Sequence, residues 1–143
     1  MSSPLRAAVN AAASALNAER TRLEVAVSNL ANIESTRGPD GQPYRRRDVV
    51  LETAPVDSFD QVLGRASTSG VRVAQVVEDQ SAPKMRYEPS HPDADKDGYV
   101  ALPNVDPAEE MVDMVSAARA YQANLTAIGL IRDMVQRSLE LGK

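Results

Sequence analysis

The chain has 143 residues, about the length of one domain, and carries a net charge of −4 with no cysteine. The acidic balance argues against general affinity for nucleic acid, which depends on neutralising many phosphates. The absence of cysteine excludes disulfides and thiolate chemistry, and no run of about 20 apolar residues is present that could insert into a membrane.

The N-terminal region predicts one long amphipathic helix over residues 4–33. Its apolar positions recur every seven residues, at Val9, Leu16, Leu23 and Leu30, and another helix has to cover such a seam. At ~1.5 Å per residue the helix would be roughly 45 Å long, which is longer than the core of so small a chain. We therefore expect it to pair with the other terminal helix and with further copies of the chain.

A signal peptide is the competing interpretation of this region. The Ala-rich stretch after Arg6 ends in Ala13–Ala15, where small residues have the spacing of a cleavage site. However, Asn10 and Asn17 interrupt the apolar stretch, and the seven-residue repeat continues through the would-be cleavage site. We therefore expect an uncleaved helix.

The central region, residues 34–103, holds seven of the nine prolines and five of the seven glycines. This composition predicts short strands and turns. Residues 55–69 and 89–98 have no regular period and predict loops. The three candidate strands are Tyr44–Thr53, Val71–Val77 and Met85–Glu88.

The C-terminal region predicts a second long helix over residues 107–141, roughly 52 Å at ~1.5 Å per residue. Asp106 can cap this helix, and Pro107 suits its first turn. Its apolar positions step by three and four residues, at Met111, Met114, Ala118, Tyr121, Leu125 and Ile128.

Together these elements predict a mainly α fold. The long N- and C-terminal helices would pair in a coiled-coil-like bundle, with a small β-rich central region. The helical core domain would comprise residues 1–33 and 104–143, and residues 34–103 would form the central region.

One motif suggests a metal site. Asp93, Asp95, Asp97 and Gly98 have the spacing of the first half of an EF-hand calcium loop. The position of the loop's final glutamate, however, is occupied by Asn104. We therefore favour an acidic turn and assign no metal ligands.

No catalytic site is evident either. His91 is the only histidine, so it cannot complete a typical zinc site without cysteines. The basic run Arg45–Arg47 could bind phosphate, but a solvated or subunit-contacting strand explains it better. We expect no enzyme activity and no cofactor.

Three asparagines lie within the predicted helices, where an amide is an unfavourable choice. Asn29 and Asn32 are one turn apart near the end of the first helix, and Asn124 lies in the last helix. They either face solvent or form hydrogen bonds across the seam and fix its register, as buried polar residues do in coiled coils.

Several segments resemble a known family. Ser28–Thr36 (SNLANIEST) is similar to the signature near the N-terminus of flagellar rod and hook proteins. Thr36–Arg46 (TRGPDGQPYRR) resembles the sequence that follows this signature in the proximal-rod proteins. Further similar segments are Tyr87–Asp95 (YEPSHPDAD), Pro103–Asp106 (PNVD), Glu110–Met114 (EMVDM) and Ala118–Asn124 (ARAYQAN).

The resemblance implies a structural subunit of the bacterial flagellar basal body. Such subunits stack helically into the proximal rod, transmit motor torque and line the export channel with their helices. The implied partners are other copies, neighbouring rod proteins, the adaptor between the rod and the membrane ring, and the flagellar type III export apparatus. Export would deliver the chain to the periplasm without a cleaved signal.

The residues expected to form assembly contacts are Leu16, Leu23, Asn29, Leu30, Asn32, Met111, Met114, Ala118, Tyr121, Asn124, Leu125 and Ile128. The alternative is a soluble helical binding module that responds to calcium. Metal titration with a fold readout would separate the two hypotheses.

Overall fold

The computed structural model describes residues 3–55 and 69–141. Helix α1 spans Ser3–Ala31 and helix α3 spans Pro107–Glu140, so both helices end within two residues of their predicted limits. The strands between them are β1 (Arg47–Pro55), β2 (Ser69–Glu78), β3 (Lys84–Tyr87) and β4 (Tyr99–Leu102). The mainly α fold class is confirmed. Strand β4 was not predicted, and the predicted loop over 55–69 lies almost entirely outside the described residues.

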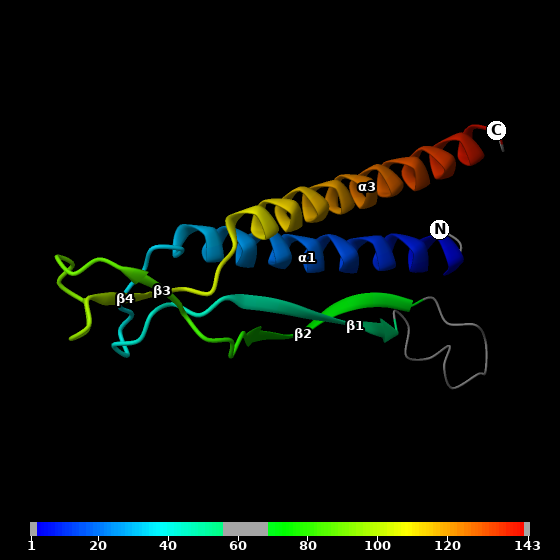
Figure 1. Cartoon of the computed structure of the whole chain (residues 1–143). Coiled ribbons are helices and arrows are strands. Elements are labelled where there is room, and N and C mark those ends of the chain that lie inside the picture. The colour runs from blue at the N-terminus through cyan, green and yellow to red at the C-terminus, as the bar shows by residue number, and fades with distance from the viewer. Residues whose placement is uncertain (1–2, 56–68, 142–143) are drawn as a thin grey trace.

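The elements form three layers, with α1 in the middle (Figure 1). Helix α3 runs antiparallel to α1 on one side, and the β1–β2 hairpin lies along the other side. The hairpin is attached to the helix, because the Val71 N–H donates to Ser14 Oγ over 3.0 Å. The expected pairing of the two terminal helices is confirmed, and the central region covers a second side of α1, which the sequence did not predict.

Among the described residues, the fully buried apolar side chains of the two helices are all alanine. Ala7, Ala18 and Ala26 are buried on α1, and Ala117 is buried on α3. Small side chains let helices approach closely, but each removes little apolar area from water, at about 25 cal/mol per Å². The seam is therefore close-packed but gains modest stability for its length.

The β1–β2 hairpin turns a valine-rich face toward α1. Val71 and Val73 are half-buried. A β-bulge then leaves Ala74 unmatched in the register. Val77, which lies an even number of residues after Val71 and Val73, is also half-buried, while 44% of the Val76 surface is exposed.

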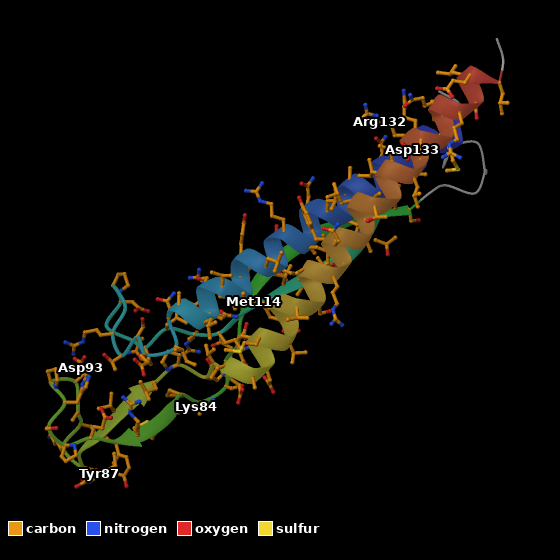
Figure 2. The ribbon with its side chains drawn as sticks, turned by 90° about the horizontal axis from the view of Figure 1, so that it is seen from above. Lys84, Tyr87, Asp93, Met114, Arg132 and Asp133 are labelled. Atoms are coloured by element: carbon orange, nitrogen blue, oxygen red, sulfur yellow. The ribbon has the colours of Figure 1, made fainter. Side chains whose placement is uncertain are left out.

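The β3–β4 hairpin extends beyond the helix pair. Figure 2 shows its residues Lys84 and Tyr87 at the end of the molecule opposite Arg132. The rings of Tyr87 and Tyr99 meet edge to face, with centroids 5.3 Å apart. The turn that joins the strands is ordered by Asp95, whose Oδ1 accepts from the N–H groups of Asp97 (2.9 Å) and Tyr99 (2.8 Å).

The close packing of this turn gives the first testable prediction. Gly98 has φ +85°, and an added Cβ would lie 2.8 Å from Tyr87 Cε2 and 3.1 Å from Pro89 Cβ. Gly41 has a similar φ of +79° with open space around it, so it is a matched control. We expect Gly98→Ala to lower the free energy of unfolding by about 1–3 kcal/mol more than Gly41→Ala, because only the former overpacks. Urea titration followed by tyrosine circular dichroism measures both; equal losses would contradict the steric argument.

Candidate functional site

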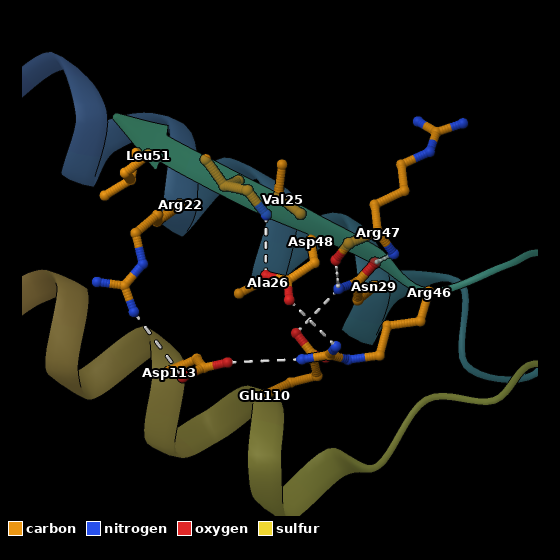
Figure 3. A pocket seen from close by; sticks show the side chains of 11 residues that line it. Arg22, Val25, Ala26, Asn29, Arg46, Arg47, Asp48, Leu51, Glu110 and Asp113 are labelled. Atoms are coloured by element: carbon orange, nitrogen blue, oxygen red, sulfur yellow. Dashed lines mark hydrogen bonds and ion pairs between the residues drawn. The ribbon is translucent and has the colours of Figure 1, made fainter. Parts of the chain in front are cut away.

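The most deeply buried large side chains gather where α1 ends and α3 begins, and two of them are polar. Asn29 on α1 and Glu110 on α3 are each only 1% exposed. Arg46, which immediately precedes β1, completes the group (Figure 3). We call Asn29, Arg46 and Glu110 the polar junction, because each comes from a different segment of the fold.

The amide of Asn29 uses its full hydrogen-bonding capacity. Its Nδ2 donates to Glu110 Oε2 over 3.0 Å and to the Arg47 carbonyl over 2.8 Å. Its Oδ1 accepts from the Tyr44 hydroxyl and from the Arg47 N–H, both over 2.9 Å. Two donors and two acceptor sites are all that an asparagine offers, so this side chain fits only one arrangement of its neighbours.

Arg46 neutralises Glu110. The Arg46 Nε lies 2.6 Å from Glu110 Oε1, and further carboxylates lie within 4 Å, at Asp48 (3.8 Å) and Asp113 (3.6 Å). Burial by itself lowers the pKa of Arg46, but its hydrogen bond to Glu110 and the three negative charges outweigh that effect, so the pKa is raised. The guanidinium therefore stays charged and holds the carboxylate charge inside the fold.

The position of Arg46 corrects the interpretation of the basic run. Strand β1 begins at Arg47 rather than at Tyr44, and the Arg46 N–H donates to Asn104 Oδ1 over 3.0 Å. The Arg46 side chain is only 18% exposed, whereas Arg45 and Arg47 are exposed. Arg46 is thus an interior ion-pair partner, neither a phosphate ligand nor a solvated strand residue.

A buried ion pair of this kind is costly to break. Removing one partner strands the other charge and typically costs about 3–5 kcal/mol, although the intact pair adds little net stability. An alanine seam distinguishes weakly between neighbouring registers because its side chains are alike. The polar junction therefore contributes the specificity that the alanine seam lacks.

A groove of about 380 Å³ opens beside the junction, between α1, α3 and β1 (Figure 3). Arg22 and Asp113 face each other across it, with Arg22 Nη2 3.9 Å from Asp113 Oδ1. These two charged side chains of the groove thus form an ion pair with each other. Within residues 3–55 and 69–141, no set of three or more acidic or histidine side chains is arranged to hold a metal ion.

The aspartates of the calcium-like motif have different interaction partners. Asp93 accepts from Thr36 Oγ1 over 2.8 Å and lies 3.5 Å from Arg37 Nη1. Asp95 instead receives the backbone N–H groups of its own turn. These contacts connect the turn to the segment after α1, which supports a structural role for the motif.

Helix α3 has a second apolar face, which α1 does not cover. Met111, Val112 and Val115 are 55%, 68% and 52% exposed, and Leu125 is 48% exposed. Together with Ala118 they form what we call the outer face of α3. Met111, Val112 and Val115 line a shallow apolar groove with Ser116 and Arg119 at its edge.

Comparison with known proteins matches both helical segments. Residues 9–39 match the family described as "Flagella basal body rod protein", and residues 96–141 match "Flagellar basal body rod FlgEFG protein C-terminal". The flagellar basal-body rod protein FlgC of Salmonella typhimurium is 48% identical over 92% of this chain and 93% of its own length. The FlgC proteins of Bacillus subtilis (43%; 94% and 96%) and Borreliella burgdorferi (40%; 96% and 97%) are similar over comparable spans.

The chain belongs to the FlgC family of flagellar basal-body rod proteins. It is a structural subunit of the flagellar rod and not an enzyme. Over the residues that the structure describes, neither long helix is apolar enough to cross a membrane. The two matched segments contain Asn29 and Glu110, so each contributes one helical member of the polar junction.

The predicted assembly residues fall into two groups in this FlgC-family chain. The first group is half-buried or buried within the chain and comprises Leu16, Leu23, Asn29, Leu30, Asn32, Met114, Tyr121, Asn124 and Ile128. The second group is exposed on the outer face of α3 and comprises Met111, Ala118 and Leu125. Their part in assembly remains a prediction.

The three asparagines differ from one another. Only Asn29 forms a hydrogen bond to the opposite helix, as the register hypothesis requires. Asn32, which directly follows α1, donates to the Ser28 carbonyl, and Asn124 donates to the Ala120 carbonyl one turn earlier in α3. A role for Asn32 or Asn124 in contacts between subunits stays a prediction.

Sequence reasoning missed Arg46 and Glu110. A signal was present for Glu110, because it lies four residues before Met114 and seven before Ala117, on the same helix face. An acidic residue inside a seam requires a cationic partner. No local pattern could identify Arg46 as that partner, because 64 residues separate the two.

The junction yields a second prediction, with a control just after the same helix. Asn29→Asp keeps the side-chain volume but places a carboxylate beside Glu110, and it removes both amide donors. We expect it to lower the free energy of unfolding by about 3 kcal/mol or more. Asn32→Asp, where one local hydrogen bond is lost, should cost about 1 kcal/mol. Urea denaturation measures both variants, and similar losses would show that Asn29 holds no special position.

Proposed function

We propose that this chain is a subunit of the proximal rod that assembles helically through its terminal helices. The supporting observation is the outer face of α3, which remains exposed after α1 has covered the inner face. Further along α3, the apolar side chains of Leu130 and Met134 are also exposed, at 60% and 53%. An apolar surface that extends along a helix is typical of an interaction site, and neighbouring copies or other rod proteins would bury it.

We also propose a division of roles along the chain. Residues 1–33 and 104–143 would build the tube, line its channel and transmit torque, because the long helices are its continuous elements. Residues 34–103 would lie outside the tube. This arrangement is supported by the β1–β2 hairpin, which lies on the side of α1 away from α3 (Figure 1).

Family membership supports a proposal for the individual partners and for the export route. We propose contacts with neighbouring rod proteins and with the adaptor between rod and membrane ring, and passage through the flagellar type III export apparatus to the periplasm. The unbroken course of α1 through Ala13–Ala15 supports export without cleavage at that site.

An exposed position on α3 separates assembly from folding and gives the third prediction. Leu125→Asp places a charge on a surface that is already 48% exposed, so the free energy of unfolding should change by only about 0.5 kcal/mol. Incorporation into the rod should fail, because the charge would be buried without a partner in the assembly. The measurements are urea titration of the purified chain, recovery of the chain in isolated basal bodies, and motility.

Val76→Asp on β2 is the matched control, since Val76 is 44% exposed but lies on the hairpin. We expect this variant to assemble and to support motility. Normal incorporation of Leu125→Asp would exclude its surface from the assembly contacts. Failure of both variants would point to a general loss of solubility.

A further inference from the structure

One face of α1 is left uncovered by both of its neighbours within the chain. Arg20, Glu24, Val27 and Ala31 are exposed and lie three or four residues apart, so they share one face of the helix. Val27 is 50% exposed, the only large apolar side chain so exposed in the described part of α1. We call these four residues the free face of α1.

The outer face of α3 carries a charge that complements this free face. Arg119 lines the apolar groove of α3, and it forms no ion pair with any of the described residues. Glu24 on α1 is 61% exposed and pairs only with Arg20, its neighbour one turn away. An exposed pair of that kind is weak, so Glu24 remains available to a second arginine.

We propose that the outer face of α3 packs antiparallel on the free face of α1 of a second copy, with Arg119 paired to Glu24 of that copy. This inference rests on the proposed function and names the partner and register of its assembly contact. The two faces belong to different helices, so the contact is heterologous and each copy can bind the next one. A rod requires a contact that repeats in this way.

The register follows from matching side chains along both helices. In an antiparallel pair that places Glu24 opposite Arg119, Val27 meets Ser116 and Ala31 meets Val112. On the side of the ion pair toward the end of α1, an apolar residue thus meets a small one at both positions, and Val112 forms a ridge that a helix can receive in its groove.

The antiparallel choice also agrees with the chain's own geometry. Within one copy α3 already runs antiparallel to α1 (Figure 1). Copies that share one orientation along a rod therefore present every α3 antiparallel to every α1. The proposed contact repeats the helix arrangement inside the chain, on faces that the internal pair leaves free.

The absence of native cysteine allows a direct test. Two full-length versions, one with Val27→Cys and one with Ser116→Cys, are expressed together in flagellated cells, and isolated basal bodies are oxidised. We expect a disulfide-linked dimer containing one copy of each version. Because each version has a single cysteine, an internal disulfide cannot form. The matched control replaces Val27→Cys with Thr53→Cys, on the exposed surface of β1, and should give no dimer.

The ion pair is then tested by charge exchange. Arg119→Glu in the Ser116→Cys copy should reduce the dimer about threefold or more, since attraction becomes repulsion. Adding Glu24→Arg to the Val27→Cys copy should restore the yield. The same Glu24→Arg change should not restore a loss caused by Arg132→Glu on the distal part of α3.

Each outcome decides a separate question. If the chain is recovered in basal bodies without the mixed dimer, or with a Ser116–Ser116 dimer, the proposed contact is overturned while the rod function stands. If charge exchange fails to restore the yield, the Arg119–Glu24 register is wrong. If the unmodified chain is missing from basal bodies, the proposed function itself fails.

Discussion

The carboxylate of Glu110 is held out of water where three parts of the chain meet, and the positions of both helices and of the hairpin depend on it. Arg46 neutralises it from the start of β1, and Asn29 contacts it from the end of α1. Removing Arg46 would leave the buried charge of Glu110 without a cation, which costs more than the ion pair contributes. The junction thus acts chiefly by making other arrangements unfavourable.

This constraint matters because the rest of the helix seam is permissive. Ala18, Ala26 and Ala117 are nearly identical in shape, so these buried positions distinguish weakly between neighbouring registers of the two helices. A slide of one turn would move Glu110 about 5 Å away from both of its partners. An alanine seam brings the two backbones close, and the polar junction determines where along their length they meet.

The helices were predictable because their signals are local. The seven-residue repeat and the Asp106 cap lie within the segments they define, and the Asp106 carboxylate indeed accepts from the N–H groups of Ala108 and Glu109. The partner of Glu110 was not predictable, because only the folded chain brings Arg46 to it. The bulge in β2 was not predictable either, because it depends on the pairing with β1, which leaves Ala74 unmatched.

The predicted seam of α3 illustrates an intermediate case. Met114, Tyr121 and Ile128 are half-buried, but Met111 and Leu125 from the same predicted stripe are exposed. The stripe combined parts of two apolar faces, because steps of three and four residues can be drawn along more than one side of a helix. Sequence alone cannot divide them between an internal partner and an external one.

The internal junction and the external face are physically joined. Arg46 and Asp113 belong to the interior ion-pair cluster, and both also line a second surface groove, together with Val112 on the outer face of α3. If the junction were broken, Arg46 would no longer be held against α3 and the wall of that groove would change. The surface that we propose for docking is therefore complete only in a chain whose helices have paired in the correct register, so a misaligned subunit would present a different surface to the next copy.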